Sequence, residues 1–184
     1  IKITYPKKRD GLSISFRDRV YQRSINDNIL YPEMTKHFIY DNRACQTGKG
    51  PDKARNRVKK MLRKYYINCG TNEGWILQTD VKSYYPNMSH AAVKNTFKEH
   101  LSEDVHAMIC DVLDTQYKGE IGYNPGSQMV QIAGISLLDK TDHYIKEVLH
   151  QKYYLRYIDD SMMIAQTKEE LESVLENLER KMKE

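Results

Sequence analysis

The feature that most constrains this chain is a tight acidic turn, Tyr157-Ile158-Asp159-Asp160, between two short apolar runs. The runs 153–157 and 161–165 are rich in aromatic, branched and long apolar side chains, which predicts a β-hairpin. Two adjacent carboxylates at a hairpin tip repel each other, and a simple turn would favour Asn-Gly or Asp-Gly. The pair therefore indicates a cation such as Mg²⁺, which prefers carboxylate oxygen. A solvated acidic turn is the alternative.

A third aspartate, Asp80, ends another apolar run, 75–81, which predicts a buried strand. Helix capping explains Asp80 poorly, because the next predicted helix starts only near Ser89. If the three strands are neighbours in one sheet, Asp80 meets Asp159 and Asp160. Three clustered carboxylates could hold two divalent metal ions, the arrangement that in-line phosphoryl transfer needs.

Length, charge and cysteine content narrow the class of protein. The chain of 184 residues is long enough for one domain, or for one compact domain with a smaller lobe. Its net charge of +4 is a mild basic bias. Three separated cysteines without a Cys-x-x-Cys pair do not favour a disulfide framework or a zinc module, and they are typical of a cytoplasmic protein. The sequence shows no long apolar run and no secretory signal, so no contact with a membrane is predicted.

Residues 51–66 predict a strongly basic helix. Pro51 suits the first helical turn, and apolar residues form one stripe. Cations repeat at helical spacing on another face, at Lys53, Arg57, Lys60 and Lys64. Only Asp52 opposes them, which favours a surface facing a polyanion over a solvated helix.

The remaining elements follow from local signals. Residues 1–16 predict a hairpin with a cationic tip, and residues 17–30 a helix that ends near Pro32. A long helix is predicted from 127 to about 150, and a last helix after the capping box at Thr167. The order of strands and helices predicts an α+β fold, with an antiparallel sheet covered on one face by helices.

Taken together, these motifs resemble those of a reverse transcriptase of the bacterial retroelement type. Tyr157-Ile158-Asp159-Asp160 matches the family's Tyr-x-Asp-Asp box, and the segment from Asp80 to Tyr85 resembles its first palm motif. Residues 126–131 resemble the Gly-Asn-x-x-Ser-Gln box, with valine in place of the serine. Residues 6–20 and 42–54 resemble two blocks of the fingers. The resemblance covers nearly the whole chain, in the family's order.

The resemblance implies fingers over residues 1–74 and a palm over residues 75–184, with a palm sheet similar to RNA-recognition and ferredoxin-like folds. It implies an RNA-directed DNA polymerase that adds deoxynucleotides to a primer 3′-hydroxyl. The partners would be an RNA template, a DNA or RNA primer and deoxynucleoside triphosphates. The cofactors would be two Mg²⁺ ions, or Mn²⁺ in their place.

The resemblance also implies roles for individual residues. The catalytic and metal-binding residues would be Asp80, Asp159, Asp160 and, through its carbonyl, Val81. The nucleotide-binding residues would be Lys8, Arg9, Tyr85, Gly126 and Gln128. The residues at the primer and template would be Tyr157, Lys53, Arg57, Lys60 and Lys64. Among these, Tyr85 would lie under the deoxyribose and exclude a 2′-hydroxyl, and Arg9 would grip the triphosphate.

The family's later palm motifs and thumb have no counterpart in this sequence. We therefore expect further domains or a homodimer, and weak primer extension by this chain alone, in a bacterial or phage-associated cytoplasm. Gln131 favours diversity-generating, retron or phage-defence enzymes over group II intron maturases. Two alternatives come from other classes: a non-catalytic RNA-binding module, and an assembly domain that keeps the polymerase fold.

Overall fold

The computed structural model describes residues 2–3, 9–10, 14–124 and 126–182. Contacts within the chain divide it into two compact units. We call residues 1–38 and 83–137 the helical unit, and residues 39–82 and 138–184 the sheet unit. These contact units do not coincide with the division at residue 74 that the resemblance implies, so the assignment of fingers and palm stays a prediction.

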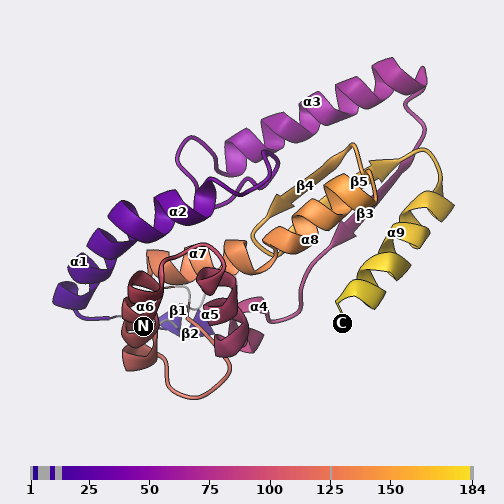
Figure 1. The fold of residues 1–184 in the computed structure, drawn as a ribbon. Helices are drawn as coiled ribbons and strands as arrows, with labels where there is room; N and C mark the ends of the chain where they lie inside the picture. Colours follow the sequence, from indigo (N-terminus) through magenta and orange to yellow (C-terminus); the bar gives the residue numbers. More distant parts are fainter. Residues whose placement is uncertain (1, 4–8, 11–13, 125, 183–184) are drawn as a thin grey trace. The chain divides into compact units, whose positions relative to one another are not determined.

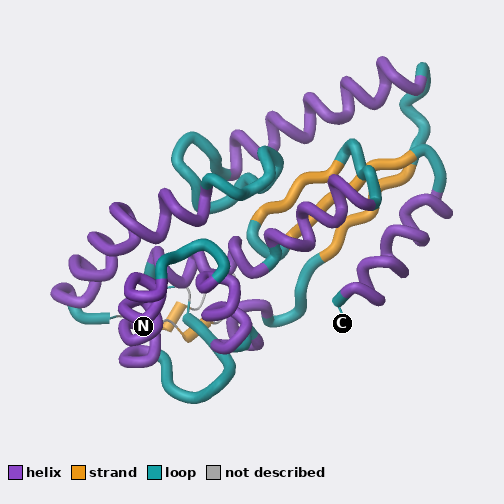
Figure 2. Tube along the Cα trace, in the orientation of Figure 1, coloured by secondary structure: helices purple, strands orange, loops and turns teal. Residues whose placement is uncertain are grey.

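A three-stranded antiparallel sheet forms the centre of the sheet unit (Figures 1 and 2). Its strands are β3 (Trp75–Thr79), β4 (Tyr154–Tyr157) and β5 (Asp160–Ala165), in the order β3-β5-β4. The predicted hairpin is therefore present as β4 and β5, and the strand that precedes Asp80 is its neighbour. The fold is α+β, as the sequence predicts.

Helices cover both faces of this sheet, so the prediction of one covered face was wrong. Helix α3 (Pro51–Cys69) packs on one face, where Met61 and Tyr65 meet Leu155 and Ile164. Helix α9 (Lys168–Lys181) packs on the other face together with the helical turn η2 (Tyr144–Val148), against a core that includes Met163. Successive strand residues point to opposite faces, so one short hairpin supplies two separate cores.

Strand β3 lies at an edge of the sheet and is less buried than predicted. Trp75 and Ile76 are 51% and 57% exposed. Among the described strands, β3 pairs only with β5, and α3 contacts β4 instead of covering β3. The apolar composition of this run predicts a strand correctly, but it cannot tell an edge position from a central one.

The helical unit is built around α7 (Gln128–Leu137), whose residues are buried on nearly every side. Helices α1 (Phe16–Ile25), α2 (Tyr31–Thr35) and α5 (His90–Lys98) contact it. The remaining described elements of the unit are η1 (Asn26–Leu30), α4 (Tyr84–Asn87), α6 (Glu103–Gln116), β1 (Lys2–Ile3) and β2 (Arg9–Asp10). A helix that is apolar all round is stable only when other helices surround it, which explains this arrangement.

The N-terminal hairpin is present in part. Strands β1 and β2 pair antiparallel, with Lys2 opposite Asp10, and the cationic tip with Lys8 lies outside the described residues. The predicted second strand gives way to α1 at Phe16, because Ser15 caps that helix by accepting a hydrogen bond from the Asp18 amide.

Two predicted helix ends differ in the structure. Pro32 does not end the first helix. The π-helical turn η1 interrupts the α-helical hydrogen bonds just before Pro32. Pro32 therefore lies in the first turn of α2, where its missing N–H breaks no helical hydrogen bond. The long helix predicted over 127–150 is divided after Leu137, where α7 ends and α8 (Asp139–His143) begins. No proline or glycine occupies position 138, so no local signal predicts this break.

The described helices include none that combines the length and the apolar character needed to cross a lipid bilayer.

Candidate active site and basic pocket

The hairpin β4–β5 turns through two residues, Ile158 and Asp159, between the paired residues Tyr157 and Asp160. Ile158 has a φ of 60°, a conformation that a β-branched side chain rarely adopts. The first central position of a two-residue turn with positive φ normally carries glycine. Backbone strain of this kind persists only where surrounding structure enforces it, and it gathers at functional sites.

The register of the sheet brings Asp80 to this turn. Thr79 lies opposite Ser161, and their hydroxyl oxygens are 2.7 Å apart. Asp80 follows Thr79, so it comes next to the end of β5 that begins with Asp160. The charge of Asp80 lies close enough to Asp159 to raise the pKa of the Asp159 carboxyl. The predicted meeting of the strand ends is therefore present.

The charges at this end of the sheet repel one another. Burial raises the pKa of the Asp159 carboxyl, and the charges of Asp80 and Asp160 raise it further, although a backbone hydrogen bond at Asp159 acts the other way. A divalent cation would relieve this repulsion, so the carboxylates fit such an ion as part of an incomplete protein cage. In the parts of the chain that the structure describes, no group of three or more His, Cys, Asp or Glu side chains is arranged so that it could hold a metal ion, so Asp80, Asp159 and Asp160 do not form the predicted three-carboxylate cluster. The ligand role of Val81 and the primer contact of Tyr157 stay predictions.

A buried arginine holds the strained turn. Arg156 is 2% exposed, and its Nη1 donates a hydrogen bond to the Ile158 carbonyl at 2.6 Å. Its Nε and Nη2 donate to the two carboxylate oxygens of Asp142, each at 2.7 Å. Asp142 is fully buried and also accepts a hydrogen bond from the Tyr154 hydroxyl at 2.6 Å. We call Arg156 and Asp142 the buried clamp, because they join the turn to α8.

The predicted nucleotide-binding residues lie in the helical unit. Tyr85 packs against α7 at Gly134, where an added Cβ would come within 3.0–3.1 Å of the tyrosine ring. The glycine therefore permits the close approach that places this ring. Of the predicted residues at the N-terminus, Arg9 belongs to β2, and Lys8 is outside the described residues. The role of each stays a prediction.

Gly126 and Gln128 line a cavity of about 360 Å³ at the start of α7, together with Arg19 and Gln22 of α1. The side-chain oxygens of Gln22 and Gln128 are buried and have no hydrogen-bond partner among the described residues. A buried amide oxygen without a partner is unfavourable, so the cavity suits a ligand that brings N–H or O–H donors. The sequence gives no signal for the contribution of Gln22.

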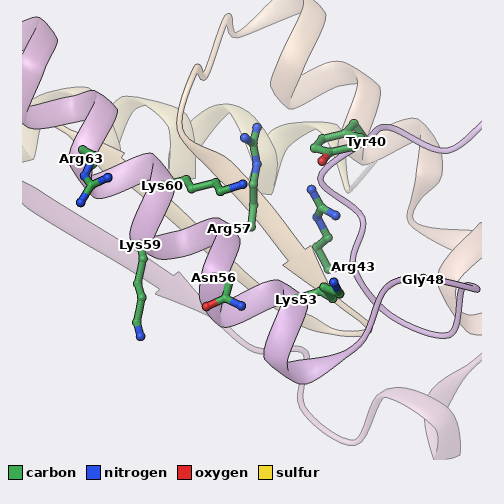
Figure 3. Close-up of a pocket in the computed structure, with 9 residues that line it drawn as sticks. All are labelled: Tyr40, Arg43, Gly48, Lys53, Asn56, Arg57, Lys59, Lys60 and Arg63. Atoms are coloured by element: carbon green, nitrogen blue, oxygen red, sulfur yellow. The ribbon is translucent and has the colours of Figure 1, made fainter.

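A second cavity, of about 580 Å³, lies in the sheet unit between α3 and the loop that precedes it (Figure 3). We call it the basic pocket. Its cationic lining residues are Arg43, Lys53, Arg57, Lys59, Lys60 and Arg63. Three of the four cations predicted to face nucleic acid are among them, whereas Lys64, which is also described, does not line it. The spacing of charges on the helix predicts the face, but the loop residues Tyr40 and Arg43 come from a segment whose fold the sequence does not reveal.

A buried carboxylate arranges the cations of this pocket. Asp41 is 4% exposed and accepts two hydrogen bonds from Arg57, at 2.6 and 2.9 Å. Arg43 and Lys146 lie 3.6 and 3.5 Å from its oxygens. Burial alone would raise the pKa of the Asp41 carboxyl, but these three cations outweigh burial and hold the pKa below its usual value.

Comparison with known proteins supports the fold alone. No protein-family model and no curated protein matches the sequence. Among solved structures, a telomerase from Candida albicans, in complex with a TWJ fragment of telomeric RNA, matches with a TM-score of 0.55 and 12% sequence identity. The match covers 88% of this chain and 30% of the telomerase chain, so the chain spans about a third of that protein's length.

The buried clamp predicts a large stability effect. Asp142→Ala leaves the Arg156 guanidinium buried without its carboxylate, which should lower the free energy of unfolding by about 3–5 kcal/mol. Asp114→Ala is the control, because it breaks the more exposed ion pair with Lys94 and should change stability by less than about 1 kcal/mol. Urea denaturation measures both, and equal effects would contradict the clamp.

Asp139 predicts a pH dependence of stability. Burial raises the pKa of its carboxyl to about 6; the charges of Asp142 and Glu147 add to this effect, whereas those of His143 and Arg156 oppose it. A raised carboxyl pKa favours the protonated folded state, so this contribution to stability is full below pH 3.8 and is lost as pH rises through about 6. Asp139→Asn abolishes the titration.

The stability of Asp139→Asn relative to the unmodified protein should therefore grow between about pH 4 and pH 7, by about 3 kcal/mol at ~1.36 kcal/mol per pKa unit. Urea denaturation at a series of pH values measures this change. The exposed acid Asp104, replaced by Asn, provides the control, and its relative stability should stay nearly constant. A constant difference for Asp139→Asn would show that the carboxyl titrates normally.

Proposed function

We propose that this chain is the catalytic core of an RNA-directed DNA polymerase of the retroelement type, with fingers and palm, that extends a primer with deoxynucleotides. The observation that carries the proposal is the meeting of Asp80 and Asp159 at neighbouring strand ends, where the charge of one raises the pKa of the other. The strained turn at Ile158, which the buried Arg156 holds in place, also supports the polymerase proposal. Binding of RNA alone does not require such a turn. The likeness of the fold to part of a telomerase solved with RNA adds further support.

The residues of the chain would act as follows. Asp80 and Asp159, with Asp160 and the Val81 carbonyl, would hold Mg²⁺, or Mn²⁺ in its place. Metal ions bound there make the primer hydroxyl more acidic and stabilise charge on the reacting phosphate. The hydrogen bond from Arg156 to the Ile158 carbonyl holds the backbone of the turn that carries Asp159, which would limit reorganisation during the reaction.

A non-catalytic RNA-binding module is the second candidate. The basic pocket favours it, because a cluster of six cations is sufficient to bind a nucleic acid without any chemistry. The two candidates differ in what the aspartates do: an RNA-binding module needs neither the carboxylate of Asp80 nor that of Asp159.

Replacement of either carboxylate separates the two candidates. Asp159→Asn or Asp80→Asn in the intact natural protein should reduce RNA-templated primer extension by a hundredfold or more, because metal ions contribute several kcal/mol and each ~1.36 kcal/mol is a factor of ten. The control Asp104→Asn, at an exposed position on α6, should keep the activity. If the unmodified protein shows no extension with Mg²⁺ or Mn²⁺, or the two aspartate variants match it, the polymerase proposal is wrong.

Tyr85 provides an independent test of the nucleotide site. Tyr85→Val should raise ribonucleotide incorporation relative to deoxyribonucleotide incorporation by roughly ten- to two-hundredfold, the discrimination that small steric differences in a pocket provide. Tyr85→Phe keeps the ring and should leave the ratio unchanged. Primer extension with both nucleotide types measures the ratio, and an unchanged ratio in Tyr85→Val would exclude the proposed role.

A further inference from the structure

The basic pocket has a shape that distinguishes it from a charged surface helix. Its cations come from two segments, the loop with Arg43 and the helix α3 with Lys60 and Arg63, and they line one hollow (Figure 3). Charges around a hollow act together on a ligand that enters it, and the surrounding protein reduces the screening by water. A ligand with several closely spaced negative charges fits this arrangement best.

Two of the three arginines of the pocket, Arg43 and Arg57, are held in position before any ligand binds. Asp41 fixes the Arg57 guanidinium through two hydrogen bonds and draws Arg43 to within 3.6 Å. Each side chain therefore loses little conformational entropy when it contacts a phosphate. Asp41 is 4% exposed, so its own charge lies below the pocket and not at its surface.

An exposed aromatic ring completes the pocket. Tyr40 is 67% exposed, although the Arg43 guanidinium lies 4.0 Å from the centre of its ring and the Arg57 guanidinium 5.1 Å from it. Both guanidiniums thus hold the ring at the edge of the cationic hollow. An exposed ring beside phosphate-binding cations is the combination with which proteins bind single strands, because each unpaired base can stack on an aromatic face.

We propose that the basic pocket binds a single strand of nucleic acid, with consecutive phosphates on Lys60, Arg63 and Arg57 and one unpaired base stacked on Tyr40. A duplex fits poorly, because its phosphates lie on a convex surface and its bases are stacked inside. The proposal rests on the proposed function for its ligand class, since a polymerase core acts on nucleic acid. It adds the strandedness of the ligand and the role of Tyr40.

The test measures fluorescence anisotropy of the intact protein with a labelled single-stranded RNA, a single-stranded DNA of the same sequence and the matching RNA duplex. Lys60→Gln with Arg63→Gln should weaken binding to the single strands. It should also reduce the slope of log affinity against log salt by about 1.4, at ~0.7 per phosphate contact. The matched control is Arg180→Gln with Lys181→Gln, which removes the same charge from exposed positions of α9 outside the described lining and should change the slope much less.

Substitutions of Tyr40 test the proposed base stacking separately. Tyr40→Leu should weaken binding to the single strands by roughly five- to a hundredfold, as expected for the loss of one stacked base, and leave duplex binding unchanged. Tyr40→Phe should bind like the unmodified protein. The RNA and DNA arms show which type of strand the pocket prefers.

Three results would overturn the proposal: equal slopes for the two double variants, duplex binding as tight as single-strand binding, or no effect of Tyr40→Leu. Binding of an acidic peptide in preference to both nucleic acids would also overturn it. These readouts do not involve Asp80 or Asp159. Single-strand binding without primer extension would therefore contradict only the polymerase proposal. Primer extension in a protein whose pocket variants bind single strands normally would contradict only the proposal for the basic pocket.

Discussion

The ion pair between Arg156 and Asp142 is the interaction on which the rest of the sheet unit depends. Both side chains are almost completely buried, so the protein must compensate the loss of water around two charges. It does so with paired hydrogen bonds between them, and with further bonds to the Tyr154 hydroxyl and the Ile158 carbonyl. Since each of these groups would be left unsatisfied without the others, the network fixes one geometry for the hairpin, α8 and the turn.

The same arginine links the turn to the basic pocket through its backbone. The Arg156 amide donates to the Asp41 carbonyl at 3.0 Å, and the Arg43 amide donates to the Arg156 carbonyl at 2.9 Å. Asp41 in turn holds the Arg57 side chain at the pocket. Strand β4, which leads into the turn with Asp159, and the loop that arranges the cations are therefore joined by backbone hydrogen bonds, and a shift in one would displace the other.

The two sites of the sheet unit have opposite charge, and both are organised by a buried partner of the opposite sign. Arg156 donates a hydrogen bond to the backbone of the acidic turn, and Asp41 accepts hydrogen bonds from Arg57 of the basic pocket. Arg156 restricts the backbone of the turn, and Asp41 restricts the side chain of Arg57. This arrangement suits a ligand with phosphate groups, which needs cations along its path and carboxylates only where a metal ion would be held.

The sequence by itself determined the local elements and the residues of the proposed chemistry. Two runs of aromatic and apolar side chains around an acidic turn predict the hairpin, and charge spacing predicts the cationic face of α3. The positions of Asp80, Asp159 and Asp160 after or between apolar runs predict carboxylates at strand ends. These features depend on neighbours in the chain, which a sequence displays directly.

Only the tertiary structure decided which distant residues meet. The edge position of β3, the helix break at Leu138 and the association of Tyr40 with Arg57 depend on packing between segments far apart in the chain. Arg156 shows the limit most clearly: within its strand it looks like a surface residue, and its burial follows from a carboxylate, Asp142, that a separate helix supplies. Burial of a charge is favourable only where such a partner is present, and no local pattern in the sequence records that partner.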